Sequence, residues 1–235
     1  MEGVAQPSGT VTLVFTDVEG STRLLGELGR DGYRSALADH RRLVRDSFGR
    51  LGGYEVDNQG DSFFYAFTSA PDAIAAVTAA LQALETGPIK VRVGLHTGSP
   101  ALDPPKYVGL EVHKAARIMA AGHGGQVLMS RATRELLDGS LRLRDLGEHQ
   151  LKDFERPEQL YQLGERTFPP LKTISNSNVP RPVSSFVGRD SELAELTDLI
   201  DAGRRLITLT GPGGTGRRAS RSRPPPRSSI GTAAA

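Results

Sequence analysis

Hydrophobic positions along the first two thirds of the chain fall into short apolar runs and helical spacings. Residues 10–16 form a β-branched apolar run that predicts a buried strand. A turn at 17–20 follows, with Ser21 as the predicted N-cap of a helix. Leucines at 24, 25 and 28 recur at helical spacing, and a second helix is predicted over 32–51.

The middle of the chain predicts a hairpin and then further strands and helices. Strands at 54–56 and 62–67 flank a turn at Asn58-Gln59-Gly60-Asp61. Further elements are predicted as helices near 71–85, 108–121 and 132–137, with strands near 89–97, 126–129 and 141–163. Strands mixed with helices, including a hairpin, predict an α+β sheet with helices packed on it.

The chain changes character after the region 8–165, which we assign to one folded domain. A linker is predicted over 166–185, because its residues are rich in Pro, Ser and Asn. A helix and an apolar strand ending in glycines are predicted within 186–216. Residues 217–235 contain Arg, Pro, Ser and Ala without a period, which predicts a disordered tail.

Composition narrows the class of protein. With 37% hydrophobic and 24% charged residues, the 235-residue chain is ordinary for a globular protein. There is no cysteine, which excludes disulfides and thiolate metal sites. The sequence has no 18-residue apolar run and no signal-like start at 1–9, so we expect no membrane association and a cytoplasmic location.

The net charge of +2 overstates the basic character of the folded region. Five arginines follow Gly216 without any acid, so the residues up to Gly216 carry a net charge of −3. A mildly acidic domain gives no electrostatic argument for binding nucleic acid, and we expect no such partner.

Two carboxylates are placed to hold a hard cation. Asp17 ends the first predicted strand, and Asp61 lies in the hairpin turn. If these strands are neighbours, both side chains project from one edge of the sheet, where Mg²⁺ is usually held by one or two carboxylates plus substrate phosphates. Gly20, Ser21 and Thr22 follow at a helix N-terminus, whose free N–H groups suit a phosphate. Ordinary turn residues remain the alternative on spacing alone.

Several blocks in order resemble the catalytic domains of class III adenylate and guanylate cyclases. Phe15–Thr22 resembles the metal-binding segment of these cyclases, and Gln59–Phe67 resembles their second metal-binding hairpin. Four further blocks resemble family segments in the same order: Val91–Gly98, Tyr107–Ile118, Gly125–Ser130 and Leu151–Phe154. The resemblance implies a ferredoxin-like α+β palm with a mixed or antiparallel sheet. It also implies a homodimer with active sites shared between the subunits.

The resemblance further implies roles for single residues. Asp17 and Asp61, with the carbonyl of Val18, would hold two Mg²⁺ or Mn²⁺ ions per site. Arg117 of the other subunit would stabilise the transferring phosphoryl group, and Lys152 would bind the triphosphate. A solvated helix position for Arg117 and an edge charge for Lys152 are the alternatives.

Three positions depart from the pattern of the family. Asp57 stands where the family has a base-reading lysine, and Lys106 where it has an acid, so the charges of that pair are exchanged. His113 replaces the asparagine that acts in the transition state, although a histidine still donates a hydrogen bond. A surface histidine is the alternative.

The segment after the linker resembles the entry to a signal-transduction P-loop ATPase. A working P-loop needs Gly-x₄-Gly-Lys-Ser/Thr. Here Gly211 and Gly216 are followed by Arg217 and Arg218, so we expect a truncated start that does not hydrolyse ATP.

The sequence therefore predicts a nucleotide cyclase that converts ATP, or GTP, into cyclic AMP or cyclic GMP and pyrophosphate, with reduced activity. The alternative is a cyclase-like module that binds nucleotide or dimerises and passes on a signal. Asp17, Asp61 and Arg117 favour the enzyme, and the three departures from the family favour the module.

Overall fold

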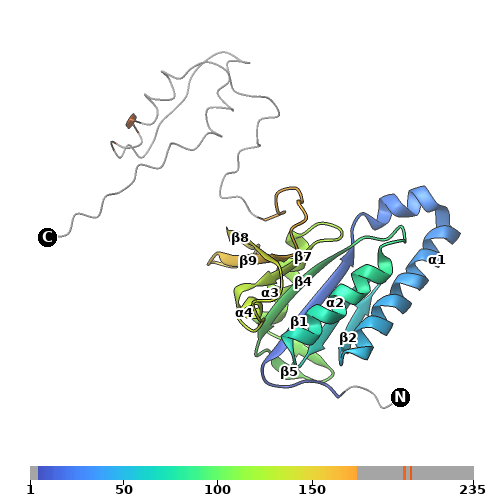
Figure 1. Ribbon diagram of the computed structural model, residues 1–235, viewed down its shortest axis with the longest axis horizontal. Coiled ribbons are helices and arrows are strands. Elements are labelled where there is room, and N and C mark those ends of the chain that lie inside the picture. The colour runs from blue at the N-terminus through green and yellow to red at the C-terminus, as the bar shows by residue number, and fades with distance from the viewer. Residues whose placement is uncertain (1–4, 174–197, 200–201, 203–235) are drawn as a thin grey trace. The chain divides into compact units, whose positions relative to one another are not determined.

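The computed structural model describes residues 5–173, 198–199 and 202 (Figure 1). The P-loop-like segment and the predicted tail lie outside these residues, apart from residues 198, 199 and 202, of which 198 and 199 are helical. The interpretation of Gly211, Gly216, Arg217 and Arg218 as a degenerate P-loop therefore stays a prediction. Within the described residues, no helix is both long enough and apolar enough to cross a membrane.

A seven-stranded sheet forms the centre of the domain, in the spatial order β2-β3-β1-β4-β7-β9-β8. Its strands are β1 (Val11–Val18), β2 (Tyr54–Gln59), β3 (Ser62–Phe67), β4 (Val91–Gly98), β7 (Val127–Ser130), β8 (Leu143–His149) and β9 (Glu158–Leu163). Only the β4–β7 pair is parallel among these neighbours. The α+β architecture expected from the sequence is confirmed.

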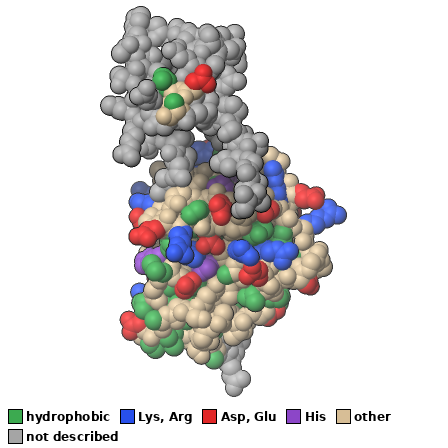
Figure 2. Space-filling view, turned by 90° about the vertical axis from the view of Figure 1, so that its left-hand side faces the viewer, with side chains coloured by type: hydrophobic (Ala, Val, Ile, Leu, Met, Phe, Trp, Pro, Cys, Tyr) green, Lys and Arg blue, Asp and Glu red, His purple; other side chains and the backbone are tan. Residues whose placement is uncertain are grey.

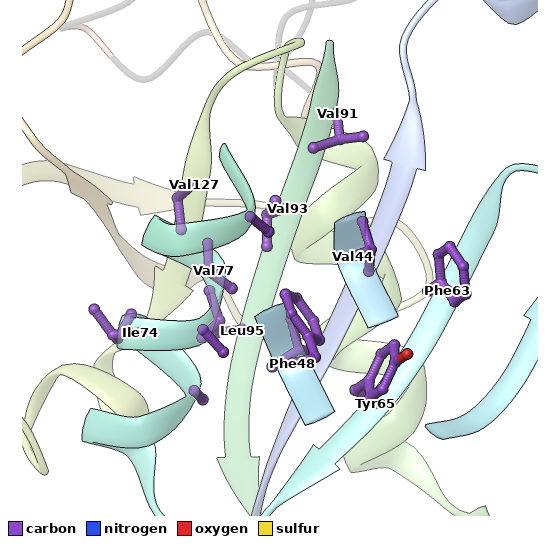
Figure 3. Close-up of a cluster of buried hydrophobic side chains, with 14 of the residues drawn as sticks. Val44, Phe48, Phe63, Tyr65, Ile74, Val77, Val91, Val93, Leu95 and Val127 are labelled. Atoms are coloured by element: carbon purple, nitrogen blue, oxygen red, sulfur yellow. The ribbon is translucent and has the colours of Figure 1, made fainter. Parts of the chain in front are cut away.

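Helices α1 (Ser21–Arg50) and α2 (Ala70–Leu84) cover one face of this sheet (Figure 1). Alternate residues of the strands point into that layer, as period-two geometry requires. Figure 3 shows Phe48 of α1 beside Tyr65 of β3 and Leu95 of β4. The rings of Phe48 and Tyr65 meet edge to face, 4.7 Å apart. This buried layer fixes α1 over the strands that carry the candidate carboxylates.

The opposite face is covered by α3 (Leu110–Ala121), and the short α4 (Arg131–Arg134) directly follows β7 in the chain. Ala115 of α3 packs with Leu13 of β1, while Ile118 packs with Leu128 of β7. Gly94 of β4 allows this approach, because a Cβ there would lie 2.2 Å from the backbone nitrogen of Met119. The close contact sets how α3 crosses the centre of the sheet.

The sequence interpretation needs two corrections in the domain. The two predicted N-terminal helices are one assigned helix, kinked at Gly29, which has φ 69° and ψ 175°. A small hairpin of β5 (Ala101–Asp103) and β6 (Lys106–Val108) was not expected.

Candidate active site

Asp17 lies near the end of β1 on the face that α3 covers. It pairs across the strands with Arg92 of β4, whose Nε and Nη2 donate to Asp17 Oδ2 at 2.9 and 2.5 Å. The two side chains keep 17% and 25% of their surface exposed, Asp17 and Arg92 respectively. A charge-assisted pair of this kind orients the carboxylate, which stays reachable from solvent.

Asp61 occupies the turn between β2 and β3. Gly60 before it has φ 63°, a conformation that favours glycine, and its carbonyl accepts from Nε and Nη2 of Arg41 at 3.2 and 2.7 Å. Ser62, the next residue, donates from Oγ to Asp17 Oδ1 at 2.6 Å. The turn is thus tied to the end of β1, which brings Asp61 to the same edge as Asp17.

Tyr33 of α1 lies close enough to both Asp61 and Asp17 for their charges to affect its phenol. Burial raises the pKa of its phenol, and the negative charges of Asp61 and, more weakly, Asp17 raise this pKa further. Tyr33 was not singled out from the sequence, because nothing in its helical spacing indicates that Asp17 and Asp61, which lie on either side of it in the chain, come near it in the fold.

The donors at this edge suit a cation that takes most of its ligands from outside the protein. Within the described residues, no cluster of three or more His, Cys, Asp or Glu side chains is arranged to hold a metal ion. Two aspartates and the main-chain carbonyl of Val18 match the usual Mg²⁺ arrangement, in which phosphates and water complete the shell. A metal ion would share Asp17 with Arg92.

Helix α1 begins directly after the Asp17 turn. Gly20, at φ 70°, is the N-cap and makes no side-chain cap, so the assignment of the N-cap to Ser21 is wrong by one residue. Ser21 and Thr22 are the first two helical residues, whose N–H groups lack intrahelical partners. An anion near Asp17 would meet these N–H groups and the positive end of the helix.

Arg117 and His113 lie one turn apart on α3 and share one side of it. His113 is exposed, and Arg117 is about 38% exposed. Nη2 of Arg117 donates to Oδ2 of Asp153 at 2.5 Å. Asp153 has a φ of 69°, which is uncommon outside glycine, so its backbone is held in a costly conformation where its carboxylate orients the guanidinium.

Arg117 shares a pocket of about 220 Å³ with Lys152. Lys152 and Asp153 form a turn between β8 and β9 rather than a closing strand as the sequence suggested. The structure therefore brings together the two residues that the family resemblance assigns to the phosphates. Both were separated by thirty-five positions in the sequence.

A buried polar network anchors the start of α3. His96 of β4 has its Nδ1 2.7 Å from Oγ of Ser130, and its Nε2 contacts the carboxylate of Glu111 on α3. Burial lowers the pKa of His96, although the Glu111 carboxylate opposes that change. The contact fixes the rotation of α3 and hence the direction of Arg117.

The exchanged pair Asp57 and Lys106 is carried by two elements that contact one another, β2 and β6. The carboxylate of Asp57 accepts from the backbone N–H of Asn58 and from Nε2 of Gln59, both at 2.9 Å. Lys106 is exposed. None of the ion pairs among the described residues joins Asp57 to Lys106.

Sequence reasoning missed Arg92 and Ser62, although both lie inside the quoted blocks. Their contacts with Asp17 depend on which residues lie opposite one another in the sheet, and Arg92 lies opposite Asp17 across β1 and β4.

Figure 2 views the domain from its β8–β9 side, where acidic, basic and histidine side chains interleave. One ion pair between α3 and β9 joins Nζ of Lys114 to Oε2 of Glu158 at 3.1 Å.

Residues 4–165 match the profile of the family described as the adenylate and guanylate cyclase catalytic domain. This match covers well over half of the chain. The chain belongs to the adenylate and guanylate cyclase catalytic domain family. The family match ends at residue 165, before the P-loop-like segment.

Relatives and solved structures agree with this family assignment. The chain is similar to an uncharacterised protein of Mycobacterium tuberculosis, 39% identical over 201 residues, covering 80% of this chain and 70% of the relative. A solved adenylate cyclase from Trypanosoma brucei, described in its monomeric state, is 27% identical with a TM-score of 0.67, covering 74% of this chain and 99% of that chain. The adenylyl cyclase CyaB of P. aeruginosa is 25% identical with a TM-score of 0.57, covering 68% and 95%.

Proposed function

We propose that this cyclase-family domain converts ATP, or GTP, into the cyclic nucleotide and pyrophosphate. The observation that carries the proposal is the grouping of its charges. Asp17 and Asp61 come to one sheet edge, while Arg117 and Lys152 border one pocket. Carboxylates for a cation and cations for a phosphate chain are the two halves that such a reaction needs.

The carboxylate half would hold the metal ions. Asp17, Asp61 and the carbonyl of Val18 would bind two Mg²⁺ or Mn²⁺ ions, which when bound supply charge neutralisation and a more acidic ribose 3′-hydroxyl. Arg92 already lies on Asp17 and would add a fixed positive charge beside the phosphates. The N–H groups at Ser21 and Thr22 would support the same anion.

The cationic half would act on the transferring group. The 3′-hydroxyl loses its proton to solvent and its oxygen bonds to the α-phosphorus. The bond from the α-phosphorus to the bridging oxygen breaks, and pyrophosphate leaves with that electron pair. Arg117, oriented by Asp153, would stabilise charge on the phosphoryl oxygens, and His113 one turn away would donate a hydrogen bond. Lys152 would bind the triphosphate as a point charge.

We further propose a homodimer in which each site takes Asp17 and Asp61 from one subunit and Arg117 and His113 from the other. Asp17→Ala and Arg117→Ala should then each be inactive alone. Mixed and allowed to exchange, half of the dimers are heterodimers with one intact site of two, so roughly a quarter of wild-type activity should return. Exchange without any recovery would refute shared sites.

The decisive experiment is product analysis by mass, with the full chain, ATP or GTP, and Mn²⁺. Cyclic AMP or cyclic GMP that disappears in Asp61→Ala supports the proposal. Nucleotide binding without a cyclic product would instead support a catalytically impaired module. Asp57, Lys106 and His113 favour that alternative. Asp57 and Lys106 place the hydrogen-bond donor and acceptor for the base in positions exchanged relative to the family, and His113 replaces the asparagine of the transition state.

A further inference from the structure

Residues 166–173 pack against the domain after β9, and we call them the strap. Leu171 packs on the cluster around Ile118, and the backbone N–H of Lys172 donates to the carbonyl of Ala121 at 2.9 Å. The carbonyl of Pro170 lies 3.1 Å from Nε2 of His123. The strap is therefore seated at the C-terminal end of α3, the helix that carries Arg117.

Lys172 of the strap borders the same pocket as Arg117 and Lys152. The lining contains three cations and, among the described residues, no carboxylate. The carboxylates that pair with Arg117 and Lys172, which are Asp153 and Glu19, do not belong to this lining, so the wall of the pocket presents positive charge that an anion would neutralise. A di- or triphosphate carries enough negative charge and enough acceptor oxygens to engage all three cations together.

The present partner of Lys172 is a residue of the metal-binding turn. Its Nζ lies 2.6 Å from Oε1 of Glu19, and the two side chains are 42% and 36% exposed. An ion pair this exposed contributes little stability, so its exchange for a phosphate costs little. Glu19 would not be left alone, because its Oε2 also accepts from the backbone N–H of Gly124 at 2.8 Å.

We propose that Lys172 is a third phosphate-binding residue of the pocket, released from Glu19 when the phosphate chain of the nucleotide enters. The inference rests on the proposed function, because it adds a ligand to the same substrate. On this proposal the strap supplies one of the three cations that border the pocket.

The test separates direct phosphate binding from a structural role through Glu19. We would measure tripolyphosphate binding to the full chain by calorimetry, in metal-free buffer of low ionic strength, so that Asp17 and Asp61 do not contribute through metal ions. The variants are Lys172→Met and Glu19→Gln. Arg166→Met is the matched control, since it removes one strap cation that borders a different pocket.

Lys172→Met should weaken tripolyphosphate binding about tenfold, which is about 1.4 kcal/mol at 25 °C. Glu19→Gln should bind at least as tightly as the wild type, because Lys172 is then released, and Arg166→Met should be unchanged. In the ATP assay, Lys172→Met should raise KM more than it lowers kcat.

Several results would overturn the proposal. Equal weakening in Lys172→Met and Glu19→Gln would mean that Lys172 acts only by holding the turn. Equal weakening in Arg166→Met, wild-type binding in Lys172→Met, or no tripolyphosphate binding by the wild type would also refute it. If the wild type forms no cyclic nucleotide while the expected binding differences hold, the proposed function fails and the Lys172 assignment stands.

Discussion

The approach of α3 to β4 makes Gly94→Ala the sharpest test of the architecture. The new Cβ would lie 2.2 Å from the backbone nitrogen of Met119, 2.6 Å from its Cα and 2.7 Å from its Cβ. Ordinary contacts between such atoms are near 3.5–4.0 Å, so the helix must move outward by roughly 1 Å. A rotamer change cannot relieve the clash, because the nearest atoms belong to the backbone.

Overpacking of this kind costs typically about 1–3 kcal/mol, and we expect the upper end, about 3 kcal/mol. For a domain of this size that corresponds to a fall in Tm of about 6–12 °C. Thermal unfolding followed by circular dichroism measures it. Gly49→Ala is the matched control, since it lies in α1 with nothing within 4 Å of its Cβ and should gain up to about 1 kcal/mol of helix propensity.

The same substitution should reduce cyclase activity at a temperature where the variant is folded, because α3 carries Arg117 and His113. A Gly94→Ala protein that melts within about 2 °C of the wild type would refute the packing of α3 on β4.

Three further predictions concern charged or titratable residues. His40 is fully buried against Phe63, and burial lowers its pKa from 6.5 to about 4. The free energy of unfolding should therefore be highest above pH 6.5 and should fall by roughly 3 kcal/mol as the pH falls toward 4. Urea unfolding at several pH values measures this dependence, and His40→Leu should remove it. Asp17→Ala and Asp61→Ala should both abolish activity. Only Asp17→Ala should lower Tm, because it leaves the guanidinium of Arg92 without its ion-pair partner. Equal Tm values for the two variants would contradict the Asp17–Arg92 pair. Asp57→Lys combined with Lys106→Asp should raise the rate with ATP above that of the wild type and of either single variant, and an unchanged rate in the folded double variant would count against base reading by this pair.

The local elements of the domain could be predicted because hydrophobic period and turn residues act over short distances. The run at 10–16, the turn at 58–61 and the Ala-rich helix after Pro71 each correspond to an observed element. Motif order along the chain indicated the family and singled out Asp17, Asp61 and Arg117. Boundaries were less certain, since Gly29 bends α1 without ending it and the three-residue strands of the β5–β6 hairpin are too short to show a period.

Contacts between distant segments were decided only by the tertiary structure. Strand register places Arg92 opposite Asp17, and no local pattern encodes which residues face one another across two strands. Asp153 reaches Arg117 because the β8–β9 turn adopts a positive φ beside α3. Lys172 looked like part of a linker by composition, yet packing of the strap on α3 brings it to the pocket. Composition and period record what each segment prefers by itself, whereas a site is made by side chains that meet only after the segments have packed together.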